Sequence, residues 1–172
     1  MSEIRILDAA AAERERGRLA EILADCVNGG ASVSFMWPFS VADAEAWWGG
    51  TLEAVASGKS VLFGGYVDGI LSGTVQLSLD GPCNQRHRGD VRKLLVHRSA
   101  RKRGIAAALM TALETTARER NLSLLTLDTG TGTPAERLYA RLGWTKAGII
   151  PGYALNPDGT ICDTTIFWKA LG

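Results

Sequence analysis

Cysteine and histidine are scarce in this sequence, and their scarcity excludes two kinds of small-domain scaffold. The 172 residues include three cysteines, Cys26, Cys83 and Cys162, which stand far apart and form no CxxC pair. The two histidines, His87 and His97, lack the spacing of metal ligands. Disulfide-rich and zinc-stabilised domains need more of these residues at closer spacing. We therefore expect reduced, mostly buried thiols and no bound metal.

Net charge and long apolar runs are lacking as well. The formal net charge is +1 at pH 7, so no overall field draws the chain to nucleic acid or to a membrane. No stretch approaches the roughly 18 apolar residues of a membrane span, and the N-terminus has no apolar signal segment. What remains, 46% hydrophobic and 22% charged residues, is the balance of a globular protein. The sequence predicts a single cytoplasmic domain over residues 1–172, without nucleic acid or membrane partners.

Hydrophobic periodicity and turn residues divide the chain into strands and helices. Strands are predicted at 4–7, 60–67, 70–79, 89–97, 123–128, 144–153 and 161–168, and helices at 13–27, 41–57, 103–120 and 134–142. Gly29-Gly30 would end the first helix, Asp68-Gly69 would form a two-residue hairpin turn, and Pro134 would open the last helix. Because antiparallel strands precede a strand–helix–strand crossover, the order predicts a mixed α+β sheet.

A basic, glycine-containing run opens the predicted helix 103–120, directly after the strand 89–97. It consists of Arg101, Lys102, Arg103, Gly104, Ile105 and Ala106. Free N–H groups and the macrodipole make a helix N-terminus an anion site, and Gly104 and Ala106 leave the backbone uncovered. Neither GxxxxGK(S/T) nor GxGxxG is present. On these residues alone, the run is either a pyrophosphate site or a solvated basic turn.

These residues and the order of elements resemble the GNAT superfamily of acetyl-CoA-dependent N-acetyltransferases. The family signature Q/R-x-x-G-x-G/A matches Arg101, Gly104 and Ala106. The resemblance implies a GNAT-like fold, with about seven mostly antiparallel strands, four flanking helices and two splayed central strands that admit acetyl-CoA. It also implies that the backbone of Leu94, Leu95 and Val96 holds the pantetheine arm. The run 101–106 would then hold the pyrophosphate of acetyl-CoA.

A second family landmark, A-x-x-h-Y-x-x-x-G-F/W, matches near the predicted helix 134–142. The matching residues are Ala135, Leu138, Tyr139, Gly143 and Trp144. The resemblance implies that Tyr139 lies near the cofactor's sulfur, where a phenol can donate a proton to the leaving thiolate. The alternative is a core tyrosine with a satisfied hydroxyl. The family often has Asn seven residues earlier, where this chain has Gly132, so backbone or hydroxyl groups of 129–133 are the candidates to replace it.

The acceptor amine also needs a route for its proton, since an ammonium of pKa about 10 must lose one before it attacks. Asp128 ends the strand bordering the implied cleft and is the best-placed carboxylate in the sequence. A capping or turn contact would explain Asp128 equally well. Proton loss through water, with no dedicated base, is a third route.

Shorter matches bear on the acceptor. The segments 29–33, 76–79, 127–129, 151–153 and 157–159 resemble family members that acetylate a toxic, amino-acid-like β-lactam. The resemblance implies a small-molecule amine acceptor and a role in detoxification. Because substrate choice lies in loops, two alternatives stay open: acetylation of protein N-termini or lysines, and a catalytically silent acyl-CoA-binding module. Many relatives form dimers, so a homodimer is a further expectation.

Overall fold

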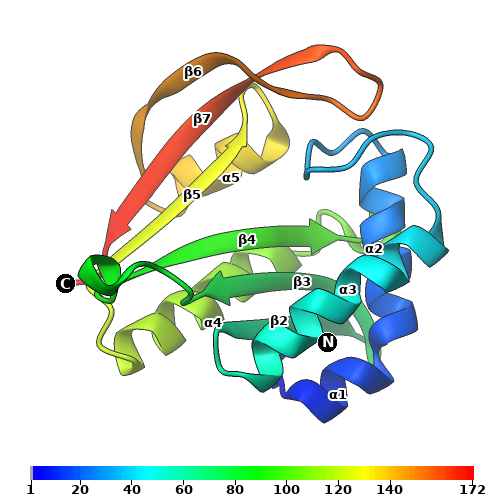
Figure 1. Ribbon diagram of the computed structural model, residues 1–172, viewed down its shortest axis with the longest axis horizontal. Coiled ribbons are helices and arrows are strands. Elements are labelled where there is room, and N and C mark those ends of the chain that lie inside the picture. The colour runs from blue at the N-terminus through cyan, green and yellow to red at the C-terminus, as the bar shows by residue number, and fades with distance from the viewer. Residues whose placement is uncertain (1) are drawn as a thin grey trace.

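A seven-stranded mixed sheet runs through the protein in the computed structural model, which describes residues 2–172 (Figure 1). The strands are β1 (Ser2–Leu7), β2 (Ser60–Val67), β3 (Ile70–Ser78), β4 (Arg88–Val96), β5 (Leu124–Gly130), β6 (Thr145–Leu155) and β7 (Ile161–Ala170). Their spatial order is β1-β2-β3-β4-β5-β7-β6, and every neighbouring pair is antiparallel except β4 and β5. The predicted mixed, mostly antiparallel sheet is confirmed.

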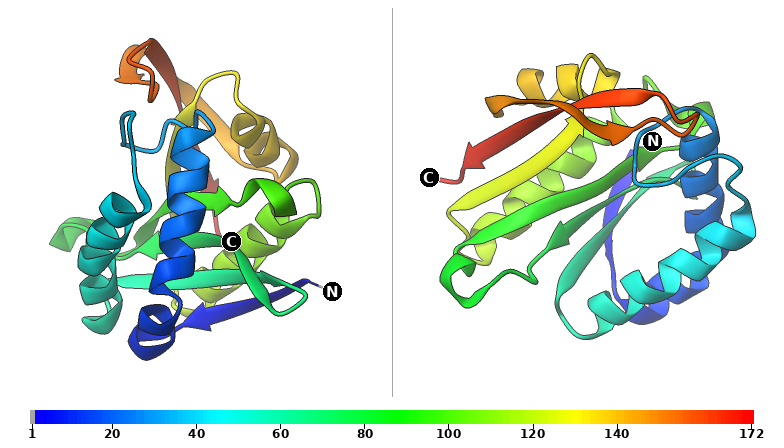
Figure 2. Two further views of the ribbon diagram at one scale, coloured as in Figure 1. Left: turned by 90° about the vertical axis from the view of Figure 1, so that its right-hand side faces the viewer. Right: turned by 45° about the horizontal axis from the view of Figure 1, so that its top comes forward.

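Helices cover both faces of the sheet (Figure 2). They are α1 (Ala9–Arg14), α2 (Arg16–Asn28), α3 (Val41–Ala56), α4 (Ile105–Glu119) and α5 (Pro134–Arg141). Buried side chains of α1, α2 and α3 pack with Leu62 and Leu71 on one face. Those of α4 and α5 pack with Val75 and Leu77 on the other. Within residues 2–172, no helix combines the length and apolarity needed to cross a membrane.

The prediction of one helix over 13–27 was wrong in its beginning and its continuity. Helix α1 starts at Ala9, because the side chain of Asp8 caps it by accepting a hydrogen bond from Ala11 N at 2.7 Å. The alanines of α1 form a helix without the apolar periodicity that marks one in a sequence. At Glu15 the backbone leaves the helical conformation, and α2 follows directly. The N-terminal segment therefore contains two helices.

The turns predicted after the first helical segment and between the strands 60–67 and 70–79 are confirmed. Gly30, at φ +89°, follows the end of α2, and Ala31 N donates to Cys26 O at 3.0 Å, which satisfies a carbonyl of the last turn. Asp68 and Gly69, at φ of 51° and 79°, form the two-residue turn between β2 and β3. The helix predicted from 103 begins two residues later, because left-handed residues precede it.

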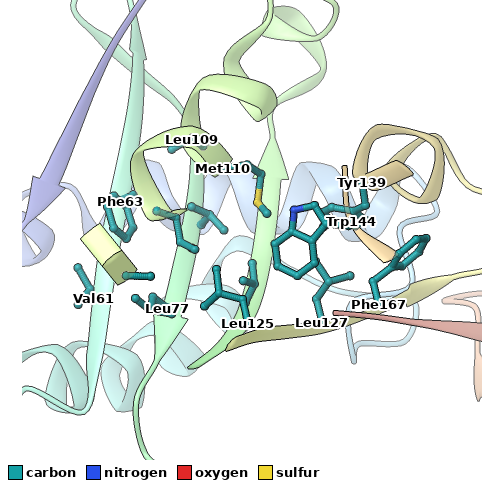
Figure 3. Packing of buried hydrophobic residues seen from close by; sticks show 14 of the residues in the cluster. Val61, Phe63, Leu77, Leu109, Met110, Leu125, Leu127, Tyr139, Trp144 and Phe167 are labelled. Carbon is teal, nitrogen blue, oxygen red and sulfur yellow. The ribbon is translucent and has the colours of Figure 1, made fainter. Parts of the chain in front are cut away.

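The core on the α4 face extends from β2 across the sheet to the aromatic residues of the C-terminal half (Figure 3). At its far edge lies a buried polar group. The carboxylate of Glu114 accepts hydrogen bonds from Lys169 Nζ at 2.9 and 2.7 Å and from Trp144 Nε1 at 3.0 Å. Lys169 Nζ also donates to Leu142 O at 2.8 Å. This network fastens α4 to β7 and to the segment after α5.

Candidate active site

The central strands β4 and β5 diverge along their length. They pair only over 88–90 and 124–126, although β4 continues to Val96 and β5 to Gly130. Past these pairs, β4 stays bonded to β3 and β5 to β7, so the two halves of the sheet open as a V (Figure 1). The predicted splaying is confirmed. Backbone groups on the facing edges lack a strand partner and are available to an extended ligand.

A β-bulge lies on β4 where the strands separate. The register with β3 shifts between Thr74 and Gln76, so Lys93 and Leu94 together face a single residue of β3. Lys93 has a φ of 53°, in the left-handed region. A bulge bends and twists its strand. The bulge therefore accounts for the divergence of β4 from β5, and it places the Lys93 side chain at the point of divergence.

The open edge of β4 leads to the N-terminus of α4. Gly104 is the N-cap residue, at φ 79°, and no side chain in residues 2–172 caps the helix. A Cβ added at Gly104 would have no atom within 4 Å. The N–H groups of the first turn therefore face open space. This arrangement can hold a phosphate against the backbone.

Two glycines of the sheet set the position of this helix end. A Cβ at Gly65 would lie 2.7 Å from Ile105 Cγ2, and one at Gly73 would lie 3.1 Å from the same atom. The first residue of α4 is thus packed directly on the backbones of β2 and β3. Because Ile105 is 1% exposed, the cradle that precedes it is held on a rigid support.

The basic residues around the cradle differ in what they contact. Asp25 of α2 accepts a hydrogen bond from Arg98 N at 2.9 Å and pairs with the Arg98 guanidinium. Arg101 Nε donates to Val96 O at 3.1 Å, and its Nη2 lies 3.8 Å from the Asp25 carboxylate. In the described chain, Lys102 forms no ion pair. Arg98 and Arg101 therefore brace the loop, whereas Lys102 is available to a ligand.

Tyr139 lies across the V from this cradle, on α5. It is 5% exposed, and its ring packs 6.1 Å from that of Trp144 and 5.9 Å from that of Phe167, measured between centroids (Figure 3). Burial raises the pKa of Tyr139 well above its ordinary value, and the nearby Asp128 carboxylate adds to the rise. The phenol is consequently neutral and a proton donor at any physiological pH.

Asp128 is exposed on the diverging part of β5 and lines a pocket of about 270 Å³. The α2–α3 loop contributes one wall, with Ser34 and Phe35, and the β6–β7 hairpin contributes another, with Tyr153. Hydrogen bonds hold these walls together: Trp37 N donates to Pro157 O at 2.9 Å, and Ser32 Oγ donates to Leu155 O at 3.1 Å. A small molecule in this pocket would meet the Asp128 carboxylate.

The segment that follows β5 is occupied by its own contacts. Gly132 N donates to Glu136 Oε2 at 2.6 Å, and Gly132 O accepts from Arg137 Nη1 at 3.0 Å. Thr133 Oγ1 donates to Gly130 O at 2.7 Å and accepts from Glu136 N, which caps α5. These groups organise the start of α5. They are therefore engaged within the chain rather than free to replace the asparagine that the family resemblance implies at Gly132.

Sequence reasoning missed the residues that surround the acceptor side of this site. Lys93 Nζ donates to Val33 O at 2.8 Å and lies 5.3 Å from the ring centroids of Phe35 and Trp47. No motif marks Lys93, because its role depends on a bulge and on contacts with residues about 60 positions away. Within residues 2–172, no cluster of His, Cys, Asp and Glu is suited to hold a metal ion.

Comparison with known proteins gives a family and a fold. The model of the acetyltransferase (GNAT) family matches residues 18–144. A phosphinothricin acetyltransferase from Sinorhizobium meliloti, solved with acetyl-CoA, superposes with a TM-score of 0.84 at 19% identity, covering 99% of this chain and 89% of that one. An N-acetyltransferase from Staphylococcus aureus Mu50 gives 0.81 at 20% identity, covering 100% and 99%. A ribosomal-protein-alanine N-acetyltransferase from Brucella melitensis gives 0.79 at 21% identity, covering 98% and 99%.

Proposed function

Since the chain belongs to the GNAT family of acetyltransferases, we propose that it transfers the acetyl group of acetyl-CoA to the amino group of a small, amino-acid-like acceptor. The observation that carries this proposal is the opening between β4 and β5, which has a small pocket on the β5 side and an uncapped helix N-terminus after β4. The Sinorhizobium meliloti relative, which has the same fold, was solved with acetyl-CoA. The residues present fit this co-substrate, because Gly104 leaves the backbone of the cradle uncovered.

Acetyl-CoA supplies an activated acetyl group as a thioester. The backbone of Leu94, Leu95 and Val96 would pair with the pantetheine arm as a strand does. The pyrophosphate would lie against the first turn of α4 and the loop before it, held by N–H groups and positive charge. These residues are Arg101, Lys102, Arg103, Gly104, Ile105 and Ala106.

The proton transfers follow from the two titratable side chains of the V. The acceptor ammonium loses a proton to Asp128, or through Asp128 to water, and its nitrogen then attacks the acetyl carbon. A C–N bond forms, the C–S bond breaks, and the Tyr139 hydroxyl would donate a proton to the departing sulfur. The acylated nitrogen then loses its second proton to water, and the Tyr139 phenolate regains a proton from water. Because its pKa is raised, the Tyr139 hydroxyl carries its proton when that step begins.

The nature of the acceptor rests on a closer resemblance. Segments 29–33, 127–129 and 151–153 resemble the tabtoxin resistance protein, which acetylates an amino-acid-like toxin. All three segments lie around the pocket, whose lining includes Ser32, Asp128 and Tyr153. The Sinorhizobium meliloti relative is named as an acetyltransferase of phosphinothricin, which is likewise an amino-acid-like compound. A detoxifying or resistance enzyme is the role that these resemblances support.

A screen of acceptors with detection of free thiol tests the proposal. It should include amino acids, simple amines, peptides and a tabtoxin-type amino acid, and calorimetry should measure acetyl-CoA binding in parallel. Thiol release with small amino acids is the expected result. Thiol release with peptides alone would favour a protein N-acetyltransferase, whereas binding without release would favour a silent module. An absence of acetyl-CoA binding would overturn all of these.

We also propose that residues 1–172 act as one cytoplasmic domain that pairs with a second copy. The free thiols of Cys26, Cys83 and Cys162 suit a reducing compartment. The edge strand β6 and its hairpin expose large apolar side chains, including Tyr153 at 60% and Ile161 at 74%. An exposed apolar edge is a site of association. Sedimentation velocity should show a dimer, and a monomer at every concentration would refute the pairing.

A further inference from the structure

Lys93 is a partly buried cation whose hydrogen-bond partners are all neutral. Its ammonium donates to Val33 O at 2.8 Å and to Ser34 Oγ at 3.3 Å. The rings of Phe35 and Trp47 lie on its other sides. Within residues 2–172, no carboxylate forms an ion pair with Lys93. Burial lowers the pKa of Lys93, as expected for a charge removed from water without a bonded counterion.

The same ammonium contacts the wall of the acceptor pocket. Two of its contacts, Ser34 and Phe35, line that pocket, and so does Asp128. The Asp128 carboxylate is close enough to oppose the lowering of the Lys93 pKa, although the two groups form no ion pair. A negative group on β5 thus lines the pocket, and a positive group at the bulge of β4 contacts the pocket wall.

The hydrogen bonds of Lys93 leave it capacity for a ligand. An ammonium has three N–H donors, and two of them are used by Val33 O and Ser34 Oγ. The rings of Phe35 and Trp47 offset part of the cost of burying this charge, but in residues 2–172 no ion-paired carboxylate offsets the rest. A ligand anion beside Lys93 would compensate that charge and occupy the third donor.

We propose that Lys93 selects acceptors by their carboxylate. An α-amino acid would bind with its ammonium toward Asp128 and its carboxylate toward Lys93 Nζ, so the opposite charges of the acceptor match those of the pocket. This inference rests on the proposed acetyltransferase function and adds the chemical class of its acceptor. It makes Lys93 a specificity-determining residue of the site.

The experiment uses two matched sets of probes, the twenty L-amino acids and their carboxamides, with thiol release as readout. The wild-type enzyme should show a KM about 10-fold to 100-fold lower for its best amino acid than for the matching carboxamide, the range expected for one charged hydrogen bond. In Lys93→Met, the KM for the amino acid should rise to that of the carboxamide. The kcat, and the KM for the carboxamide, should change by less than about 3-fold.

A second variant separates recognition from a purely structural role. Lys93→Gln keeps an N–H donor for Val33 O but carries no charge, so it should lose the preference for the carboxylate as fully as Lys93→Met does. Rescue of the preference by Gln would overturn the inference, as would an equal loss for acids and carboxamides in both variants. If Lys93→Met does not fold, Lys93→Gln decides. Lys59→Met, at an exposed lysine paired with Asp80, is the control and should behave as wild type.

The two levels of the proposal fail differently. Wild-type enzyme that releases no thiol with any amine would refute the acetyltransferase function itself. Wild-type enzyme that acetylates amino acids and carboxamides with equal KM would leave that function intact and refute the selection by Lys93.

Discussion

Replacing Gly104 with alanine should weaken acetyl-CoA binding much more than it destabilises the fold. Gly104 has a φ of 79°, and an added Cβ would have no atom within 4 Å, so the methyl group meets no steric obstacle in the free protein. The cost to folding is the left-handed conformation alone, about 1–2 kcal/mol. For a chain of this size, that lowers Tm by roughly 2–8 °C. The same strain is present with and without ligand, and therefore cancels in the binding equilibrium.

The loss of affinity has a separate cause. If a phosphate lies against the first turn of α4, the methyl group pushes it away from the N–H groups. Losing one charge-assisted hydrogen bond costs about 1.5–3 kcal/mol, which corresponds to a rise in Kd of about 10-fold to 150-fold. Calorimetry with acetyl-CoA measures the affinity, and thermal unfolding followed by circular dichroism measures the stability.

The chain offers a matched control for the strain. Gly58 has a φ of 73°, and an added Cβ there would also have no atom within 4 Å, but this residue lies in the turn after α3. Gly58→Ala should therefore lose similar stability and keep the wild-type Kd. Gly104→Asn should regain stability, since Asn tolerates this conformation, yet bind as poorly as the alanine variant. An unchanged Kd in Gly104→Ala would refute the placement of the pyrophosphate, as would an equal loss of affinity in Gly58→Ala.

Three further substitutions test the site and its support. Tyr139→Phe should lower kcat by about 100-fold or more with little change in acetyl-CoA Kd, and a variant with wild-type kcat would exclude Tyr139 as the acid. Because the pKa of Tyr139 is raised, the kcat of the wild-type enzyme should show no descending limb up to about pH 10. Asp128→Asn should lower kcat by about 100-fold or more with little change in acetyl-CoA Kd, and an unaltered kcat and pH–rate profile would exclude a base there. Glu114→Ala should cost about 1–3 kcal/mol in urea unfolding, because it leaves the buried Trp144 Nε1 without its acceptor and the partly buried Lys169 without its counterion. Exposed Glu119→Ala should cost less than about 0.5 kcal/mol, and similar losses in both would contradict the reasoning.

The features predicted correctly from the sequence are those that depend on near neighbours. Asp68-Gly69 forms the expected turn, and Pro134 opens α5 after the cap residue Thr133. The signature around Gly104 located a helix N-terminus to within two residues. In each case, the conformation follows from the allowed φ of glycine or proline, or from a side chain that caps a helix a few residues away.

The features that escaped prediction depend on residues far apart in the chain. The guanidinium of Arg98, which shortly precedes the basic run 101–103, is paired with Asp25, which lies 73 positions earlier. The bulge at Lys93 arises from its register with β3, and a run of strand-forming residues carries no sign of it. No pattern in a single sequence could have supplied these pairings, because nothing in the local residues distinguishes a bracing arginine from a ligand-binding one.

These long-range contacts share a consequence for how the enzyme can change its acceptor. The α2–α3 region is fastened to β4 at two places: Asp25 holds Arg98 just beyond the strand, and Lys93 holds Val33 from within it. The α2–α3 wall of the acceptor pocket is therefore anchored to β4, the strand that pairs with β3 on one edge and faces the V with the other. A side chain that projects from this wall, such as Met36 at 44% exposed, can vary without disturbing that strand. Lys93→Met removes one of these two links and keeps the pairing of Asp25 with Arg98, so it should shift the acceptor charge preference and leave acetyl-CoA affinity near the wild-type value, whereas a substitution at Met36 should change neither.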